Sequence, residues 1–235
     1  MNMIQRAKDK LATPFVRRLL RRPGIFPVRR ELSFQYIAGS GVEVGALNAP
    51  LEVRPGVTVK YADLYETDPL RTDYAPDFIS DLESMAGIDD ASQNFVIANH
   101  VLEHVENPLR ALRSISRVLQ PGGIAFIALP NKQYTFDKRR AVTPLAHIIR
   151  DFEDGPEWSA GIHYLDWAEN VEGLRGKEAA DRASILLSTH DNIHFHVWDF
   201  VAMKEMFSYV QGITELTIQH SRQNRSECIW IVSRR

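Results

Sequence analysis

The sequence predicts an α/β fold in which a mostly parallel sheet carries helices on both faces. Apolar segments of strand length alternate with segments of helical periodicity over residues 41–131 of the 235-residue chain, which is typical of parallel strands joined by crossover helices. The alternation stops after Pro130, and the chain closes with a helix and two further strands. We therefore expect one sheet that is interrupted by a long insertion after its fifth strand.

The expected strands are short apolar runs bounded by glycine, proline or polar residues. They lie near residues 41–45, 58–63, 77–80, 94–98 and 124–129. Ahead of the fifth strand, a helix is predicted by the helical spacing of Leu109, Leu112, Ile115, Val118 and Leu119. Residues 200–210 predict a further helix, and residues 213–219 and 227–232 predict two strands joined as a hairpin.

Length and composition favour one large α/β domain. The chain is 44% hydrophobic and 25% charged, and its net charge of −2 argues against a nucleic-acid partner. The single cysteine, Cys228, excludes an internal disulfide, fits a reducing cytoplasm and is expected to be a buried strand residue. No apolar stretch approaches the ~20 residues of a membrane span, and no signal-peptide pattern opens the chain, so we expect a cytoplasmic protein without a transmembrane segment.

Residues 1–36 are basic, and we expect them to form a helical N-terminal cap. Cations dominate this region, as Arg6, Lys8, Lys10, Arg17, Arg18, Arg21, Arg22, Arg29 and Arg30 face only Asp9 and Glu31. An apolar stripe of Leu11, Phe15, Val16, Leu19 and Leu20 predicts a short helix that Pro23-Gly24 ends. This helix could cover the domain with its apolar face, or its basic face could meet anionic lipid or an anionic substrate. Both interpretations remain open.

Two predicted strands end in residues that suit a nucleoside-bearing cofactor. Glu43 and Gly45 close the first strand and Asp63 closes the second. Ligands of open α/β sheets bind at the carboxyl ends of the strands, where a glycine admits backbone N–H groups and a carboxylate about 20 residues on accepts from ribose hydroxyls. The loop after Gly45 lacks the further glycines that a pyrophosphate needs, which disfavours NAD and FAD. S-adenosylmethionine has no phosphate and remains compatible.

Further motifs follow in order along the middle of the chain. A helix start at Leu102-Glu103-His104 precedes the run Arg117-Val118-Leu119-Gln120-Pro121-Gly122-Gly123. In this order they resemble class I S-adenosylmethionine-dependent methyltransferases, closely over residues 37–131 and loosely over about the last forty residues. The resemblance implies a Rossmann-like domain over residues 37–235, a last strand that runs antiparallel, and residues 131–197 as a substrate-capping insertion.

The same resemblance implies which residues hold the cofactor. Glu43 and Gly45 would lie beneath its methionine moiety, Asp63 would bind the ribose and Asp81 would lie by the adenine. The full implied set is Glu43, Gly45, Ala46, Leu47, Asp63, Leu64, Asp81, Leu82, Asn99 and His100.

The residues after the fifth strand are expected to bind the acceptor. Aromatic faces, an amide and cations suit a sugar, a nucleotide-sugar or a phosphorylated metabolite. The predicted contacts are Asn131, Lys132, Tyr134, Phe136, Asp137, Arg139 and His163. Three motifs together resemble a bacterial branch of these methyltransferases that is associated with surface-polysaccharide and sugar modification. They are Glu43-x-Gly45-Ala46-Leu47-x-x-Pro50, Ala98-Asn99-His100-x-x-Glu103-His104 and Pro130-Asn131-Lys132-x-Tyr134-Thr135-Phe136-Asp137.

Histidines offer the candidate base or metal site. His100 and His104 lie four residues apart at a helix start, where His104 is expected to be structural, while alternation would put His194 and His196 on one side of an extended segment. The candidate bases are His196, His194 and His100, with Asp137 in reserve. If a transition-metal ion is present, His100, His194 and His196 are its expected ligands.

The expected function is methyl transfer from S-adenosylmethionine to a small polar acceptor, above all a hydroxyl of a sugar or nucleotide-sugar. A metal-assisted methyltransferase and a non-catalytic binding module on the same fold are the two alternatives. We expect no nucleic-acid partner, and peripheral membrane contact through the basic N-terminus stays open.

Overall fold

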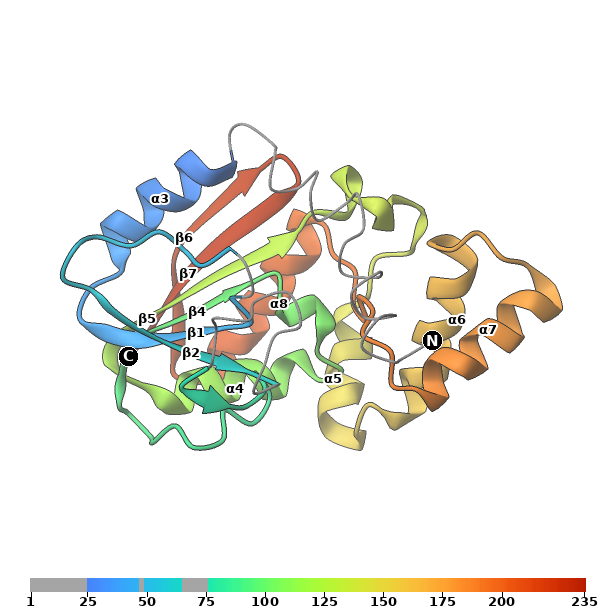
Figure 1. Ribbon diagram of the computed structural model, residues 1–235, viewed down its shortest axis with the longest axis horizontal. Coiled ribbons are helices and arrows are strands. Elements are labelled where there is room, and N and C mark those ends of the chain that lie inside the picture. The colour runs from blue at the N-terminus through green and yellow to red at the C-terminus, as the bar shows by residue number, and fades with distance from the viewer. Residues whose placement is uncertain (1–24, 47–48, 65–75) are drawn as a thin grey trace.

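The computed structural model describes residues 25–46, 49–64 and 76–235, which form a seven-stranded sheet with helices packed on both faces (Figure 1). The strands are β1 (Ser40–Val44), β2 (Thr58–Asp63), β3 (Phe78–Ile79), β4 (Gln93–Asn99), β5 (Leu119–Pro130), β6 (Leu216–Asn224) and β7 (Glu227–Arg234). Their order in the sheet is β3-β2-β1-β4-β5-β7-β6. Strands β1 to β5 pair in parallel, and β7 pairs antiparallel with both of its neighbours. The predicted Rossmann-like sheet is confirmed.

The element bounds differ from the expected ones at two turns. Strand β5 begins at Leu119, before the Pro-Gly-Gly turn, because Gln93 pairs with Leu119 and the register then shifts so that Phe95 pairs with Ile124. The hairpin between β6 and β7 is tighter than the sequence predicts. Only Arg225 and Ser226 separate the two strands, and Arg225 adopts a positive φ of 52°.

One face of the sheet carries most of the core. Helix α4 (Pro108–Val118), with Asn107 as its N-cap and proline in the first turn, and helix α8 (Phe200–Ile213) bury their apolar sides there. Helix α5 (Leu145–Asp154) joins them through Ile148. Cys228 is fully buried in β7 on this side, as expected, and burial raises the pKa of its thiol to about 12.

The opposite face is covered by α3 (Ile25–Tyr36) and by the segment between β1 and β2. The described residues of that segment contain no helix, so Leu51 packs on the sheet beside Leu32 of α3. The hydroxyl of Ser33 in α3 donates to the carbonyl of Glu52, which links the helix to the segment between β1 and β2. The apolar stripe of the expected N-terminal cap, and all of its cations except Arg29 and Arg30, lie in residues 1–24, outside the described residues. None of the described helices is long and apolar enough to cross a membrane.

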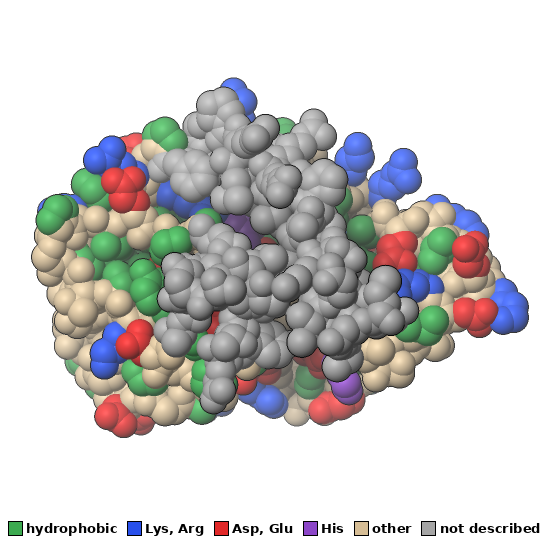
Figure 2. Space-filling model, in the orientation of Figure 1, with side chains coloured by type: hydrophobic (Ala, Val, Ile, Leu, Met, Phe, Trp, Pro, Cys, Tyr) green, Lys and Arg blue, Asp and Glu red, His purple; other side chains and the backbone are tan. Residues whose placement is uncertain are grey.

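Within the insertion, two helices form an arm beside the sheet. Helices α6 (Glu157–Asn170) and α7 (Gly176–Ser188) lie next to each other at one end of the molecule (Figure 1). They share a small core with the returning chain, in which Tyr164, Leu186 and Phe195 are buried. Figure 2 shows charged side chains of both signs around this end of the molecule. Residues 131–197 contain no strand, as the sequence predicts, but their helices were not predicted.

A buried ion pair fixes α3 to the sheet and gives a first prediction. Arg29 donates to Glu227 of β7, with 2.6 Å between Nη2 and Oε2. Removing one partner of a buried pair leaves an uncompensated charge, which costs about 3–5 kcal/mol. We expect Arg29→Met to lower the free energy of unfolding in urea by about 3 kcal/mol, because His100 also contacts Glu227 and offsets part of the loss.

The matched control is Arg30→Met. Arg30 pairs with Glu52 at 3.0 Å, but both side chains are more than half exposed, so its loss should change stability by less than about 1 kcal/mol. Equal losses in the two variants would contradict the anchoring role of Arg29.

Candidate active site

The carboxyl ends of β1, β2 and β4 bring the predicted cofactor residues to one edge of the sheet. Gly45 follows β1 with φ +63°, and its N–H donates to the carbonyl of Ala62 at 2.9 Å. A Cβ at this position would lie 2.9 Å from Cγ2 of Val101, which is too close. Both the backbone angle and the contact therefore require glycine here.

Glu43 organises the loop that follows β1. Its buried carboxylate accepts from the backbone N–H of Leu51, 3.0 Å from each oxygen, and from Nδ2 of Asn99 at 3.4 Å. Burial raises the pKa of Glu43 to about 7, although these hydrogen bonds and Arg29 act to lower it. Oδ1 of Asn99 is buried and has no hydrogen-bond partner among the described residues. An unsatisfied acceptor at this edge suits a bound group that carries an N–H donor.

The other predicted cofactor residues differ in what they contact. Asp63 accepts from the N–H of Leu64 at 2.7 Å, and the Leu64 side chain is exposed. Asp81 accepts from the N–H of Ser84 at 2.6 Å and closes a turn. Leu82 packs in the main core, so its side chain does not line the edge. Ala46 is buried beside Gly45, and Leu47 lies outside the described residues.

His100 lies at the end of β4 between two buried carboxylates. Its Nδ1 is 3.3 Å from Oε1 of Glu103, and its Nε2 is 3.2 Å from Oε2 of Glu227. Burial acts to lower the pKa of His100, but the two carboxylates outweigh it and raise the pKa above its usual value. Burial also acts to raise the pKa of Glu227, yet His100 and Arg29 hold it at about 2. Because both ring nitrogens of His100 face carboxylates, the protonated ring can donate a hydrogen bond from each nitrogen.

Asp137 and His194 form a second buried pair, the Asp137–His194 pair. Nδ1 of His194 lies 2.8 Å from Oδ2 of Asp137. Burial acts to raise the pKa of Asp137, but His194 and Arg140 lower it, so the carboxyl is ionised. Nε2 of His194 lies 4.0 Å from Oε1 of Glu103, which also contacts His100. Glu103 thus links the end of β4 to the Asp137–His194 pair.

His104 supports this pair from the side. Its Nδ1 hydrogen-bonds to the carbonyl of Ile193 at 2.9 Å, and its ring meets that of His194 edge to face at 4.7 Å. Burial, together with the nearby His194, lowers the pKa of His104 to about 4. The ring is therefore neutral, as a structural histidine would be.

The remaining predicted acceptor residues lie in and after the turns that follow β5, named η2 (Lys132–Tyr134) and η3 (Phe136–Arg139). Tyr134 is 51% exposed and Arg139 is also on the surface. Lys132 is half-buried, and Phe136 packs 4.7 Å from the ring of His194. Asn131 is buried, and its side chain accepts from the N–H of Gln133 at 3.2 Å.

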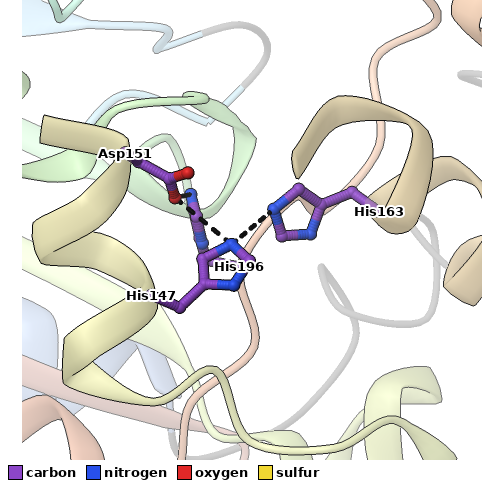
Figure 3. Close-up of side chains that lie close together, drawn as sticks. All are labelled: His147, Asp151, His163 and His196. Atoms are coloured by element: carbon purple, nitrogen blue, oxygen red, sulfur yellow. Dashed lines mark hydrogen bonds and ion pairs between the residues drawn. The ribbon is translucent and has the colours of Figure 1, made fainter. Parts of the chain in front are cut away.

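His196 and His163 belong to a separate group, the His147–Asp151–His163–His196 cluster (Figure 3). Burial lowers the pKa of His163 to about 4 and that of His196 well below its usual value. One ligand atom from each of the four residues lies within 4.8 Å of the others. The structure therefore does not bring His100, His194 and His196 around one ion, because His194 groups with Glu103 and His104 instead.

Sequence reasoning missed three residues of these groups, the buried Arg140 and Asp151 and the half-buried His147. His147 and Asp151 lie four residues apart on α5, a spacing that places both on one helix face. That spacing was the available signal. Arg140 pairs locally with Asp137, but its burial also depends on partners in α6 and in the chain after α7, which local spacing does not show.

Residues 45–127 match the family model described as a methyltransferase domain. No curated protein matches the chain.

Solved methyltransferase structures share the fold. The N-methyltransferase NodS from Bradyrhizobium japonicum, in complex with S-adenosyl-L-homocysteine, is 13% identical, and the match covers 100% of this chain and 99% of that one with a TM-score of 0.54. An S-adenosylmethionine-dependent methyltransferase from Mesorhizobium loti is 12% identical, with 88% and 96% of the two chains covered and a TM-score of 0.52. At these identities the likeness shows a common fold.

The strand order and the matched domain together define a class I methyltransferase fold. Residues 45–127 therefore carry a methyltransferase domain, on a fold shared with S-adenosylmethionine-dependent methyltransferases.

The raised pKa of Glu43 gives a prediction for the protein without cofactor. The folded pKa of about 7 exceeds the ordinary value of 4.5, so stability should fall as pH rises from about 4.5 to about 7. Glu43→Gln keeps an oxygen for Leu51 and removes the charge. We expect the variant to gain stability relative to the natural chain between pH 5 and pH 8, by up to about 3 kcal/mol.

Urea denaturation at the two pH values measures this difference. The control Glu52→Gln changes an exposed carboxylate that pairs with Arg30, and its effect should be the same at both pH values. A pH-independent effect of Glu43→Gln would contradict the raised pKa.

Proposed function

We propose that this methyltransferase transfers the methyl group of S-adenosylmethionine to a hydroxyl of a sugar or nucleotide-sugar. The observation that carries the proposal is the Asp137–His194 pair, in which a buried carboxylate and an imidazole lie 2.8 Å apart. A hydroxyl is a weak nucleophile until a base accepts its proton, and such a pair is a suitable base. Through Glu103, the pair is connected to His100 at the carboxyl end of β4.

The residues at the sheet edge fit the cofactor. Asp63 offers a carboxylate for the ribose hydroxyls, and Gly45 leaves the backbone open to close approach. Oδ1 of Asn99 is a buried acceptor without a partner among the described residues, and the ammonium group of the cofactor's methionine moiety would satisfy it. When bound, S-adenosylmethionine would supply a methyl group on a sulfonium. The acceptor oxygen would attack the methyl carbon in line, and the sulfur would leave as the thioether of S-adenosylhomocysteine.

Residues 131–197 are proposed to cap the acceptor site. The exposed ring of Tyr134 offers a face on which a sugar can stack, and Lys132 and Arg139 offer cations to phosphate groups of a nucleotide-sugar. These side chains come from the turns directly after β5, next to the sheet edge that binds the cofactor in this proposal.

His194 is the proposed base, and Asp137 orients it. An Nδ1–H donated to Asp137 fixes the tautomer and leaves the lone pair of Nε2 for the acceptor proton. Arg140 donates to the other oxygen of Asp137 at 3.0 Å, so the carboxylate is held on both sides. Glu103, 4.0 Å from Nε2, would stabilise the imidazolium that forms.

The cofactor assignment predicts that S-adenosylhomocysteine binds and stabilises the protein. A ligand at about 100 times its dissociation constant should add roughly 2.7 kcal/mol to the free energy of unfolding. Asp63→Ala removes the charged acceptor of the ribose hydroxyls and should weaken binding about 10–100-fold, as a lost charged hydrogen bond does. Calorimetry measures both effects.

Asp89→Ala serves as the matched control, because Asp89 is an exposed acid away from the carboxyl ends of the strands. Its affinity for S-adenosylhomocysteine should stay unchanged. Absence of binding by the natural chain, or equal weakening in both variants, would contradict the assigned cofactor site.

The base assignment predicts that His194→Gln and Asp137→Asn lower kcat by about 100-fold or more. Their affinity for S-adenosylhomocysteine should stay within about twofold of the natural chain, because the proposal gives both residues to the acceptor side. The assay follows S-adenosylhomocysteine release with a panel of sugars, nucleotide-sugars and, as the competing class, amines.

His190→Asn is the control, since His190 is exposed and asparagine tolerates its positive φ of 45°. Unchanged kcat in the His194 variant would refute the base. Turnover of amines alone would refute the hydroxyl acceptor while leaving methyl transfer intact.

A further inference from the structure

The His147–Asp151–His163–His196 cluster has the spacing of a metal site. Nε2 of His147 lies 3.1 Å from Nε2 of His163 and 3.3 Å from Oδ2 of Asp151, and Nε2 of His196 lies 3.8 Å from the same oxygen. Zinc bonds of about 2.0–2.1 Å in a tetrahedron place neighbouring ligand atoms about 3.4 Å apart. Figure 3 shows Asp151, His147 and His163 directed toward one another.

The buried carboxyl group of Asp151 has few partners in the neighbouring protein. The residue is fully buried, and its Oδ2 has no hydrogen-bond partner among the described residues. No lysine or arginine in the described part of the chain forms an ion pair with it, and the basic groups within 4.0 Å of it there are the rings of His147 and His196. A buried carboxylate in such surroundings is costly unless it is paired or coordinates a cation.

The contact between His147 and His163 leads to the same conclusion. Two imidazole nitrogens 3.1 Å apart need either one shared proton or one shared cation between them. A proton directed at His163 would leave Oδ2 of Asp151 without a donor. A cation bound by both rings and by the carboxylate satisfies all three groups at once.

A surrounding shell already orients the side chains. The hydroxyl of Ser159 donates to Oδ1 of Asp151 at 2.8 Å, which leaves Oδ2 for a ligand bond. Nε2 of His196 donates to the carbonyl of Glu106 at 3.1 Å, and its Nδ1 is buried without a hydrogen-bond partner in the described structure, so Nδ1 is the nitrogen of this ring that is left to bind an ion. Metal-binding histidines and carboxylates are held by such outer contacts. The His147 side chain is 17% exposed, which provides a route of access from solvent.

We propose that His147, Asp151, His163 and His196 bind one divalent first-row transition metal ion, with zinc as the expected occupant. Three imidazoles and one carboxylate suit zinc, and they disfavour magnesium, which prefers oxygen ligands and bound water. Four protein ligands leave no open position, so the ion is structural. It joins α5 of the main core to α6 of the arm and to the chain after α7, and it does so independently of the acceptor.

The experiment starts from the full chain, purified without chelator and analysed for metals by mass spectrometry. We expect about one zinc ion per chain, and removal by chelator should lower the melting temperature. Adding zinc to the stripped protein should restore it in a concentration-dependent way. Cobalt(II) in place of zinc should give the visible absorption of a tetrahedral site.

Variants assign the ligands. Asp151→Asn and His163→Gln should each abolish stoichiometric zinc, and the milder Ser159→Ala should weaken zinc binding about 10–100-fold by releasing Asp151. His104→Gln is the control, because it removes a ring from the neighbouring group of Glu103, His104 and His194 and should leave the metal content unchanged.

A natural chain that holds no metal, and whose melting temperature does not respond to zinc, cobalt, manganese, iron or nickel, would overturn the proposal in favour of a shared proton. Zinc that survives Asp151→Asn and His163→Gln but is lost in His104→Gln would also overturn it. These readouts do not depend on methyl transfer, so they can fail while the proposed function holds.

Discussion

The insertion depends on one buried cation, the guanidinium of Arg140. Its Nε donates to Asp166 of α6 at 2.6 Å, and its Nη1 donates to Asp137 at 3.0 Å and to the carbonyl of His194 at 2.7 Å. A buried charge is tolerated only when its donors are satisfied, so these partners must converge on it. The turn after β5, the arm and the returning chain therefore have to meet at Arg140, and that meeting point holds the Asp137–His194 pair in position.

The sequence was sufficient for the sheet but not for the arm. Strands and helix α4 bury aliphatic side chains at regular spacing, so their periodicity was visible. Helix α6 buries the polar residues Ser159 and His163 and exposes Ile162. Because polar and apolar side chains share its buried face, α6 gives no continuous apolar stripe to detect.

In the candidate site, too, the sequence could place some residues together and not others. Glu43, Asp63 and Asn99 could be placed together because the carboxyl ends of parallel strands share one edge. The alternation assumed for His194 and His196 holds for a paired strand, but residues 191–199 form no strand and do not join the sheet. The directions of their side chains are consequently set by the groups that lie around them in space. His194 goes to Asp137 and His196 to the cluster around Asp151, contacts that no local spacing encodes.

One extended segment therefore carries both a proposed base and a proposed metal ligand, two residues apart. The carbonyls of His194 and Phe195 accept from Arg140, and the ring of His196 is held by Glu106 and its cluster. A base must be fixed within a fraction of an ångström to act on an acceptor, and the bonds from Arg140 fix the backbone at His194 and Phe195. For the proposed base, the arm therefore contributes rigidity, because the guanidinium of Arg140 joins Asp166 of α6 to the backbone of His194.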